Sequence, residues 1–149
     1  ELLKGSAGGN LLSLIAELLA APEDGRIKLF LIYRALLARR AELELFQHGA
    51  YQKLTVIGSL KSHVVAFARE QGERRALIVA PRFSSGLVDD GRYPLGESVW
   101  HETRVLPPAG SRLRWRDALT GEIVQGEEAL WLREVFRYFP VALLINELS

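Results

Sequence analysis

The chain has 149 residues, of which 48% are hydrophobic and 25% charged, a composition typical of a globular domain and not of a disordered or fibrous protein. Lys and Arg number 19 against 18 Asp and Glu, and a net charge of +1 argues against a broad nucleic-acid-binding surface. The absence of cysteine excludes disulfides, thiol nucleophiles and cysteine-ligated zinc, and three scattered histidines indicate no metal site.

The sequence begins at Glu1 and contains no methionine, so we expect it to be a piece of a longer protein. Nothing near its start resembles a secretory signal. The near-apolar run 29–38 is interrupted by Arg34 and is far shorter than the ~20 residues of a membrane span. These features predict a soluble, cytoplasmic fragment that contacts neither a membrane nor nucleic acid.

The first 47 residues have the pattern of helices. Asn10 can cap a helix over 11–20, because its side-chain oxygen can accept a first-turn N–H. Pro22 and Gly25 interrupt the chain, and a second helix is predicted over 26–46. Its apolar residues lie on several sides of the helix, which is typical of a helix that is buried on most sides. We therefore expect this helix to pack against more than its neighbour.

After Gly49 the pattern changes to short strands separated by turns. An antiparallel meander that Pro81 ends is predicted for residues 53–57, 63–69 and 74–80. Further strands are predicted at 99–106, 113–115 and 122–124, with a helical turn at 133–138 and a closing strand in 139–145. The predicted fold is α+β, with a helical segment over 1–47 followed by an antiparallel β-sandwich domain over 48–149.

None of the familiar catalytic motifs is present in the sequence. It has no glycine-rich phosphate loop, no nucleophile elbow and no zinc-protease helix motif. A glycosidase holds two carboxylates about 5–9.5 Å apart across the sugar, whereas the acid pairs Asp89-Asp90 and Glu127-Glu128 lie beside glycines in predicted loops. We therefore assign no catalytic residue, no metal ligand and no cofactor.

Three tryptophans, Trp100, Trp115 and Trp131, allow two interpretations. Flat aromatic faces suit pyranose rings, so exposed tryptophans would indicate sugar binding. Each of them lies in or beside a predicted strand, however, and the sequence favours a place in the sandwich core.

A series of short motifs resembles, in order and spacing, the end of the maltooligosyl trehalose synthases. The similarity begins at Asp24-Gly25-Arg26-Ile27-Lys28-Leu29-Phe30, which resembles the last barrel helix of those enzymes. The other matching motifs are Glu44-Leu45-Phe46, Gly49-Ala50-Tyr51, His63-Val64-Val65-Ala66-Phe67-Ala68-Arg69, Val79-Ala80-Pro81-Arg82, Pro94-Leu95-Gly96, Val99-Trp100, Thr103, Trp115-Arg116-Asp117, Thr120-Gly121-Glu122 and Phe139-Pro140-Val141-Ala142-Leu143-Leu144. Residues 1–10 match nothing in the family, and His101-Glu102 stands where Gly-Asp is expected.

The resemblance implies an enzyme of the α-amylase superfamily, with a (β/α)8 barrel and a C-terminal antiparallel β domain. Such an isomerase of trehalose biosynthesis converts the reducing-end α-1,4 linkage of a maltooligosaccharide into an α,α-1,1 linkage by intramolecular transglucosylation. Its Asp nucleophile and Glu acid/base lie on barrel strands, and no motif of this chain matches their surroundings. The resemblance therefore implies a structural, non-catalytic fragment whose partner is the rest of the catalytic barrel.

Three residues at the start of the second helix, Asp24, Arg26 and Lys28, are candidates for contact with substrate. In a (β/α)8 barrel the N-terminus of each helix faces the catalytic rim, so these side chains could hydrogen-bond substrate hydroxyls. Alternatively, Asp24 caps the helix and pairs with Lys28.

Two functions without catalysis by this chain also stay open. A stand-alone α-glucan-binding module would expose roughly coplanar aromatic side chains on one sheet face. A structural domain that supports the barrel would bury its aromatic side chains and present a large apolar helix face. The helix pattern favours the structural domain, and it predicts that the isolated chain self-associates to cover that face.

Overall fold

The computed structural model describes residues 11–21, 25–83, 86–88, 92–111, 114–126 and 128–147. Within these ranges the first three helices are α2 (Leu11–Ala20), α3 (Arg26–Ala41) and α4 (Leu43–His48). The strands are β1 (Ala50–Lys53), β2 (Thr55–Ile57), β3 (Val64–Gln71), β4 (Arg74–Pro81), β5 (Arg104–Leu106), β6 (Arg114–Asp117), β7 (Ile123–Gln125), β8 (Leu130–Trp131) and β9 (Ala142–Asn146). Short helical turns lie at η2 (Lys61–His63), α5 (Glu97–Trp100) and α6 (Leu132–Val135).

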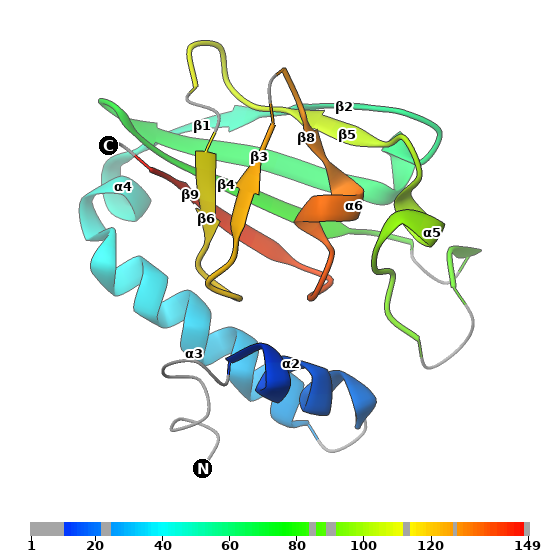
Figure 1. Cartoon of the computed structure of the whole chain (residues 1–149). Coiled ribbons are helices and arrows are strands. Elements are labelled where there is room, and N and C mark those ends of the chain that lie inside the picture. Colours follow the sequence, from blue (N-terminus) through cyan, green and yellow to red (C-terminus); the bar gives the residue numbers. More distant parts are fainter. Residues whose placement is uncertain are drawn as a thin grey trace.

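The described strands form two sheets, both of them antiparallel (Figure 1). The larger has six strands in the order β1-β3-β4-β9-β6-β7, and the smaller has three in the order β2-β5-β8. Two strands of the predicted meander are present as β3 and β4, which pair in the larger sheet, whereas its first strand, 53–57, falls mostly in β2 of the smaller sheet. The predicted α+β class with antiparallel pairing is confirmed.

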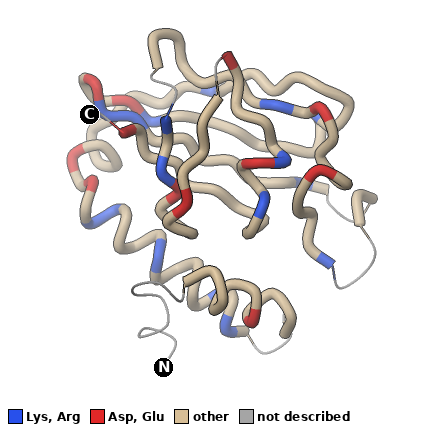
Figure 2. Tube along the Cα trace, in the orientation of Figure 1, with Lys and Arg blue, Asp and Glu red and all other residues tan. Residues whose placement is uncertain are grey.

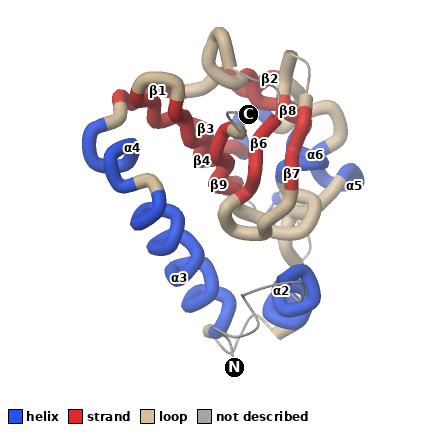
Figure 3. Tube along the Cα trace, turned by 60° about the vertical axis from the view of Figure 1, so that its left-hand side comes forward, coloured by secondary structure: helices blue, strands red, loops and turns tan. Residues whose placement is uncertain are grey.

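The six-stranded sheet is covered on both faces, because side chains alternate across its central strands. Leu77 and Leu144 belong to a core shared with the three-stranded sheet, α5 and α6. Ala76 and Ile145, one position along each strand, belong to a second core shared with α2, α3 and α4. Figure 3 shows these three helices together on one side of the larger sheet. The helices therefore share a core with the sheet they cover.

The predicted helix over 26–46 is two helices, while the predicted helix over 11–20 is confirmed. The break falls at Glu42, whose backbone has a φ of −120° and a ψ of 45°. Its carboxylate forms an ion pair with Arg74 at the start of β4, and Arg74 also donates to the carbonyl of Asn146. The break at Glu42 thus accompanies a side-chain contact with distant strands, which the local sequence pattern does not show.

The predicted strand over 53–57 is also divided. β1 ends at Lys53 in the larger sheet, and β2 begins at Thr55 in the smaller one. Leu54 lies between them, donates its N–H to the carbonyl of Ala66 at 3.0 Å and buries its side chain in the core between the sheets. Burial of this one leucine therefore accompanies the passage of the chain from one sheet to the other.

The predicted strand over 99–106 is wrong in its first half, where the structure has the helical turn α5. Its second half is present as β5. Trp100 is fully buried, donates its indole N–H to the carbonyl of Pro94 at 2.8 Å and packs on Phe136 with ring centroids 5.0 Å apart. A helical turn accommodates this contact, which involves residues far along the chain. The helical turn predicted at 133–138 is present as α6. Of the strand predicted at 113–115, Leu113 lies outside the described residues.

A close approach fixes the turn at Gly58 and Ser59, which the sequence predicts. Gly58 has a φ of 127°, and a Cβ there would lie 2.5 Å from Cα of Thr103. The N–H of Ser59 donates to Oε1 of Glu102 at 2.7 Å, which lowers the pKa of Glu102 to about 2. The N–H of Leu60 donates to Oγ1 of Thr103 at 3.1 Å. The turn is thus held against the two residues that precede β5, and the short helix η2 follows it.

Charged side chains of both signs are spread over the whole trace, in keeping with the net charge of +1 (Figure 2). Among the described residues, no helix is both long and apolar enough to cross a lipid bilayer. A cytoplasmic location stays a prediction.

Candidate functional site

The start of α3 holds two of the three residues that the sequence singled out. Arg26 donates from its guanidinium to Oε1 of Glu17 at 3.1 Å, which ties α3 to α2. Lys28 is exposed on the next part of the helix. Asp24 lies outside the described residues, and the residue before the helix, Gly25, has no side-chain capping bond. Arg26 therefore contributes to packing between helices, and contact of these residues with substrate stays a prediction.

Asp117 is the buried carboxylate of the described chain. Its Oδ1 accepts the N–H of Leu119 at 2.9 Å and the N–H of Leu143 at 3.3 Å. Burial raises the pKa of Asp117 from its usual range to about 7, and these hydrogen bonds, Thr120 and the charge of Arg34 oppose that shift only in part. Asp117 therefore holds the turn after β6 against β9.

The space beside Asp117 is too small for a sugar. A cavity of about 50 Å³ lies there, lined also by Glu122, Glu134 and Tyr138. Such a volume holds one or two water molecules, each of which occupies about 30 Å³ in the liquid. A glycosidase-like reaction needs a pair of carboxylates on opposite sides of a bound ring. This arrangement therefore offers a titrating carboxyl group without room for a substrate.

Within the described ranges, no three His, Asp or Glu side chains come together in a way that could hold a metal ion. Of the acid pairs noted in the sequence, Glu128 is exposed, as expected for a turn residue, and Asp89, Asp90 and Glu127 lie outside the described residues.

Trp100 and Trp115 are fully buried, which confirms their place in the core. Trp131 is half-buried and lines a groove of about 670 Å³ together with Gln125 and Glu128. The guanidinium groups of Arg104 and Arg133 lie 5.3 and 4.7 Å from the centre of its ring. A sugar would have to displace a cation from this indole before stacking on it.

The outward side of α3 is the most apolar exposed surface of the helices. Leu29, Ile32 and Leu36 recur at the spacing of one helix face and are 60%, 47% and 58% exposed. Leu43 of α4 is exposed beyond them, whereas Phe30 and Ala38 on the other side of α3 are buried against the sheet. We call Leu29, Ile32, Leu36 and Leu43 the α3 outer face.

Comparisons with known proteins agree with the resemblance that the sequence motifs indicate. No family model matches the chain. Two curated relatives, from two strains of Mycobacterium tuberculosis, are 32% identical to it over 120 residues, which are 80% of this chain, and their names assign them provisionally to the maltooligosyl trehalose synthases. The solved structure of a mutant maltooligosyltrehalose synthase from Arthrobacter ramosus is 31% identical, covers 83% of this chain and superimposes with a TM-score of 0.61. The chain is similar to part of a maltooligosyl trehalose synthase.

This similarity confirms the resemblance that the sequence motifs indicated. The chain spans only 14% of the length of the Mycobacterium relatives and 14% of the Arthrobacter structure. Many of the matching motifs lie at the turns and in the core described above, as expected for residues that maintain a shared fold.

Two features of the surface and interior were not indicated by the sequence. Asp117 was noted only as part of a motif, and its burial follows from β9 pairing beside β6. A groove between β2 and β3 is lined by Lys53, Lys61 and Arg82, which come from separate segments of the chain. A local sequence pattern does not join residues that distant.

Proposed function

We propose that the chain is the C-terminal part of a maltooligosyl trehalose synthase. In this proposal α2 and α3 are the last helices of the catalytic barrel, and residues 48–149 form the C-terminal β-sandwich domain. The whole enzyme, an isomerase of the α-amylase superfamily, would rearrange the reducing-end linkage of maltooligosaccharides to an α,α-1,1 linkage. The similarity over 80% of this chain supports the proposal.

The observation that carries the proposal is the α3 outer face. A helix at the edge of a domain turns polar residues outward, yet Leu29, Ile32 and Leu36 are exposed here. Burying a side chain of this size contributes about 1.5–3 kcal/mol, so an uncovered row of them favours contact with further protein. A helix of a (β/α)8 barrel has such contacts, because it packs on the barrel strands and on neighbouring helices.

In this proposal the segment has a structural role in the enzyme and carries no catalytic residue. Asp117 is buried beside a cavity too small for a sugar, and Arg26 is paired with Glu17. The carboxylates that carry the reaction would lie elsewhere in the enzyme. We therefore expect the 149-residue chain alone to leave the reducing ends of maltopentaose unchanged over a day.

The proposal is tested in the whole enzyme by placing charges on the α3 outer face. The double variant Ile32→Asp, Leu36→Asp should lower the melting temperature and the rate of loss of reducing ends, because it buries two carboxylates against the barrel. The control is Ile123→Asp on β7, a comparably exposed apolar residue away from α3. A double variant as stable and active as the control would contradict the proposal.

The alternative is a stand-alone α-glucan-binding module, and the Trp131 groove is the observation in its favour. Against it, Tyr51 and Phe83 are the only exposed aromatic side chains in the described part of the chain. Saturable binding of maltopentaose by the 149-residue chain in calorimetry, lost in Trp131→Ala, would favour the alternative.

A further inference from the structure

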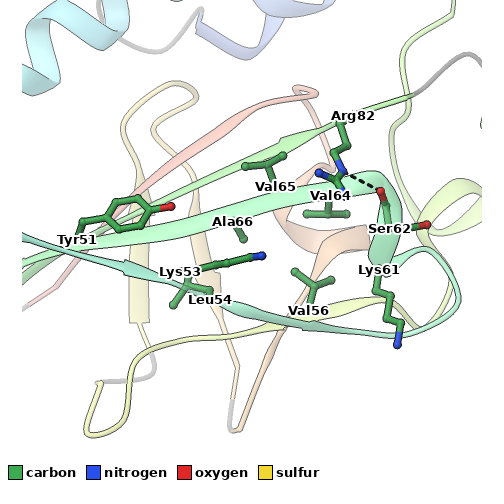
Figure 4. Close-up of a pocket in the computed structure, with 10 residues that line it drawn as sticks. All are labelled: Tyr51, Lys53, Leu54, Val56, Lys61, Ser62, Val64, Val65, Ala66 and Arg82. Carbon is green, nitrogen blue, oxygen red and sulfur yellow. Dashed lines mark hydrogen bonds between the residues drawn. The ribbon is translucent and has the colours of Figure 1, made fainter.

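A groove of about 470 Å³ opens where the chain leaves the six-stranded sheet (Figure 4). β1 pairs with β3 from Ala50 to Lys53, and the N–H of Leu54 makes one more bond to β3. The chain then joins β5 in the other sheet as β2. The first residues of β3, Val64 and Val65, are therefore left without a neighbouring strand on this side, and they line the groove.

The charged side chains that line this groove are all basic. They are Lys53, Lys61 and Arg82, and no Asp or Glu is among the lining residues. The excess is local, because the whole chain has a net charge of only +1. Within the described part of the chain none of the three forms an ion pair. Cations that line one concave surface without carboxylate partners attract an anionic ligand.

Arg82 is held in place before any ligand binds. Its Nε donates to the carbonyl of Ser62 at 2.9 Å, and its guanidinium lies 5.2 Å from the ring centre of Phe83. Its backbone N–H also donates to the carbonyl of His63 at 2.8 Å. The terminal amino groups of Arg82 remain for a ligand, and a planar guanidinium fork matches the oxygens of a phosphate.

The rest of the groove is lined by apolar side chains and by one tyrosine. Figure 4 shows the amino group of Lys53 extending across the groove and that of Lys61 directed away from Arg82. Val65, 41% exposed, gives an apolar surface, and the buried residues Leu54, Val64 and Ala66 lie behind it. Tyr51 stands at one end, 66% exposed, and is supported by Phe67 with ring centroids 5.2 Å apart.

We propose that this groove binds a phosphate group carried on a small, sugar-sized body. Arg82 and Lys53 hold the phosphate oxygens, and Tyr51 contacts the body of the ligand. The site does not depend on the proposed function of the chain, since its residues lie apart from the α3 outer face. Free phosphate shares the charged part of this chemistry and should bind the same cations more weakly.

The test follows amide shifts of the 149-residue chain by NMR during titration with glucose 6-phosphate, inorganic phosphate and glucose. We expect saturable shifts at 53–56 and 62–66 with both anions, tighter binding of glucose 6-phosphate and no saturable shifts with glucose. Binding should weaken at high salt, because exposed charges are screened. Arg82→Ala and Lys53→Ala should each weaken binding by about tenfold, the scale of one hydrogen bond to a charged group.

The matched control is Arg39→Ala, which removes one exposed positive charge from α3 and leaves the groove unchanged. Tyr51→Ala should weaken glucose 6-phosphate and leave inorganic phosphate unaffected. Lys53 is exposed, so its variant should fold and decide the matter even if Arg82→Ala does not. The proposal is overturned if neither anion gives saturable shifts, if glucose binds as tightly as glucose 6-phosphate, or if Arg39→Ala weakens binding as much as Lys53→Ala.

Discussion

Asp117 and Asn146 show how single buried polar side chains hold distant strands together. Both are buried, and both use their side-chain atoms on backbone groups. Asp117 accepts from the turn after β6 and from β9. Asn146 joins the end of β9 to the turn between β3 and β4. A buried polar group costs free energy unless it is hydrogen-bonded, so these partners stabilise one arrangement of the chain.

The first prediction concerns the pH dependence of stability. Burial raises the pKa of Asp117 to about 7, above the unfolded value of 3.8. The folded chain therefore binds the proton more tightly, and the stability due to protonated Asp117 is full below pH 4 and is lost as the pH rises through about 7. Asp117→Asn should remove a slope of at most about 1.4 kcal/mol per pH unit from the free energy of unfolding in this window.

Urea unfolding at pH 5, 6, 7 and 8 measures this slope in the native chain and in the variant. Glu134→Gln is the control, because Glu134 is exposed and accepts none of the bonds that hold β9. Equal slopes for the native chain and Asp117→Asn would contradict the prediction.

The second prediction concerns Asn146. Its Oδ1 accepts the N–H of Arg75 at 2.8 Å, and its Nδ2 donates to the carbonyl of Glu73 at 2.7 Å. Asn146→Ala removes both hydrogen bonds, leaves the N–H of Arg75 and the carbonyl of Glu73 without this partner, and should lower the free energy of unfolding by about 1–3 kcal/mol. Asn146→Asp keeps the acceptor for Arg75 and loses the donor to Glu73. Denaturant titration would contradict the prediction if the alanine variant were as stable as the native chain.

Among the elements, β9 has the greatest effect on the fold because it is buried on both faces. It lies between β4 and β6 in the larger sheet, and its side chains alternate between the two cores. The sequence predicts a buried closing strand in this apolar run. Its place in the middle of the sheet, beside strands from much earlier in the chain, was not predicted.

The third prediction follows from that position. Leu144 is fully buried and opposes Leu77 on β4 and Asp117 on β6. Leu144→Ala should lower the free energy of unfolding by about 2–5 kcal/mol, the usual cost of such a cavity. Ile123→Ala, on the exposed edge strand β7, should cost far less. Truncation after Tyr138 should abolish cooperative unfolding, since it separates β6 and β7 from β4. A truncated chain that melts like the whole one would contradict this prediction.

At the scale of the whole molecule, the α3 outer face and the buried core lie on opposite sides of one helix. Phe30 packs edge-on against Phe139, with ring centroids 5.8 Å apart, while Leu29 beside it is exposed. A helix that is apolar on several sides was predicted from the sequence to need more than one partner. The sheet supplies one of them.

The fourth prediction is that the 149-residue chain alone self-associates through the α3 outer face. Contiguous apolar surface of this kind is uncommon on soluble monomers. Sedimentation over a range of concentrations should show a dimer or larger species, and Leu36→Lys should shift the equilibrium toward monomer by about tenfold or more, the scale of one buried leucine. A native chain that stays monomeric at high concentration and binds no dye for apolar surfaces would contradict the prediction.

Local patterns in the sequence determined the helix over 11–20, the pair of strands β3 and β4, the turn at Gly58 and the buried tryptophans Trp100 and Trp115. These features depend on residues that are close in the chain or on strong apolar character, both of which are visible in a sequence. The order of the motifs also determined the resemblance to the maltooligosyl trehalose synthases.

Contacts between distant residues decided the rest. The break at Glu42 accompanies an ion pair with Arg74, the division of β1 from β2 accompanies the burial of Leu54, and the helical turn at Trp100 accompanies packing on Phe136. The burial of Asp117 and the gathering of Lys53 and Arg82 in one groove have the same origin. Each depends on which strands become neighbours, and the free energy of that pairing is shared among side chains tens of residues apart, so no local pattern contains it.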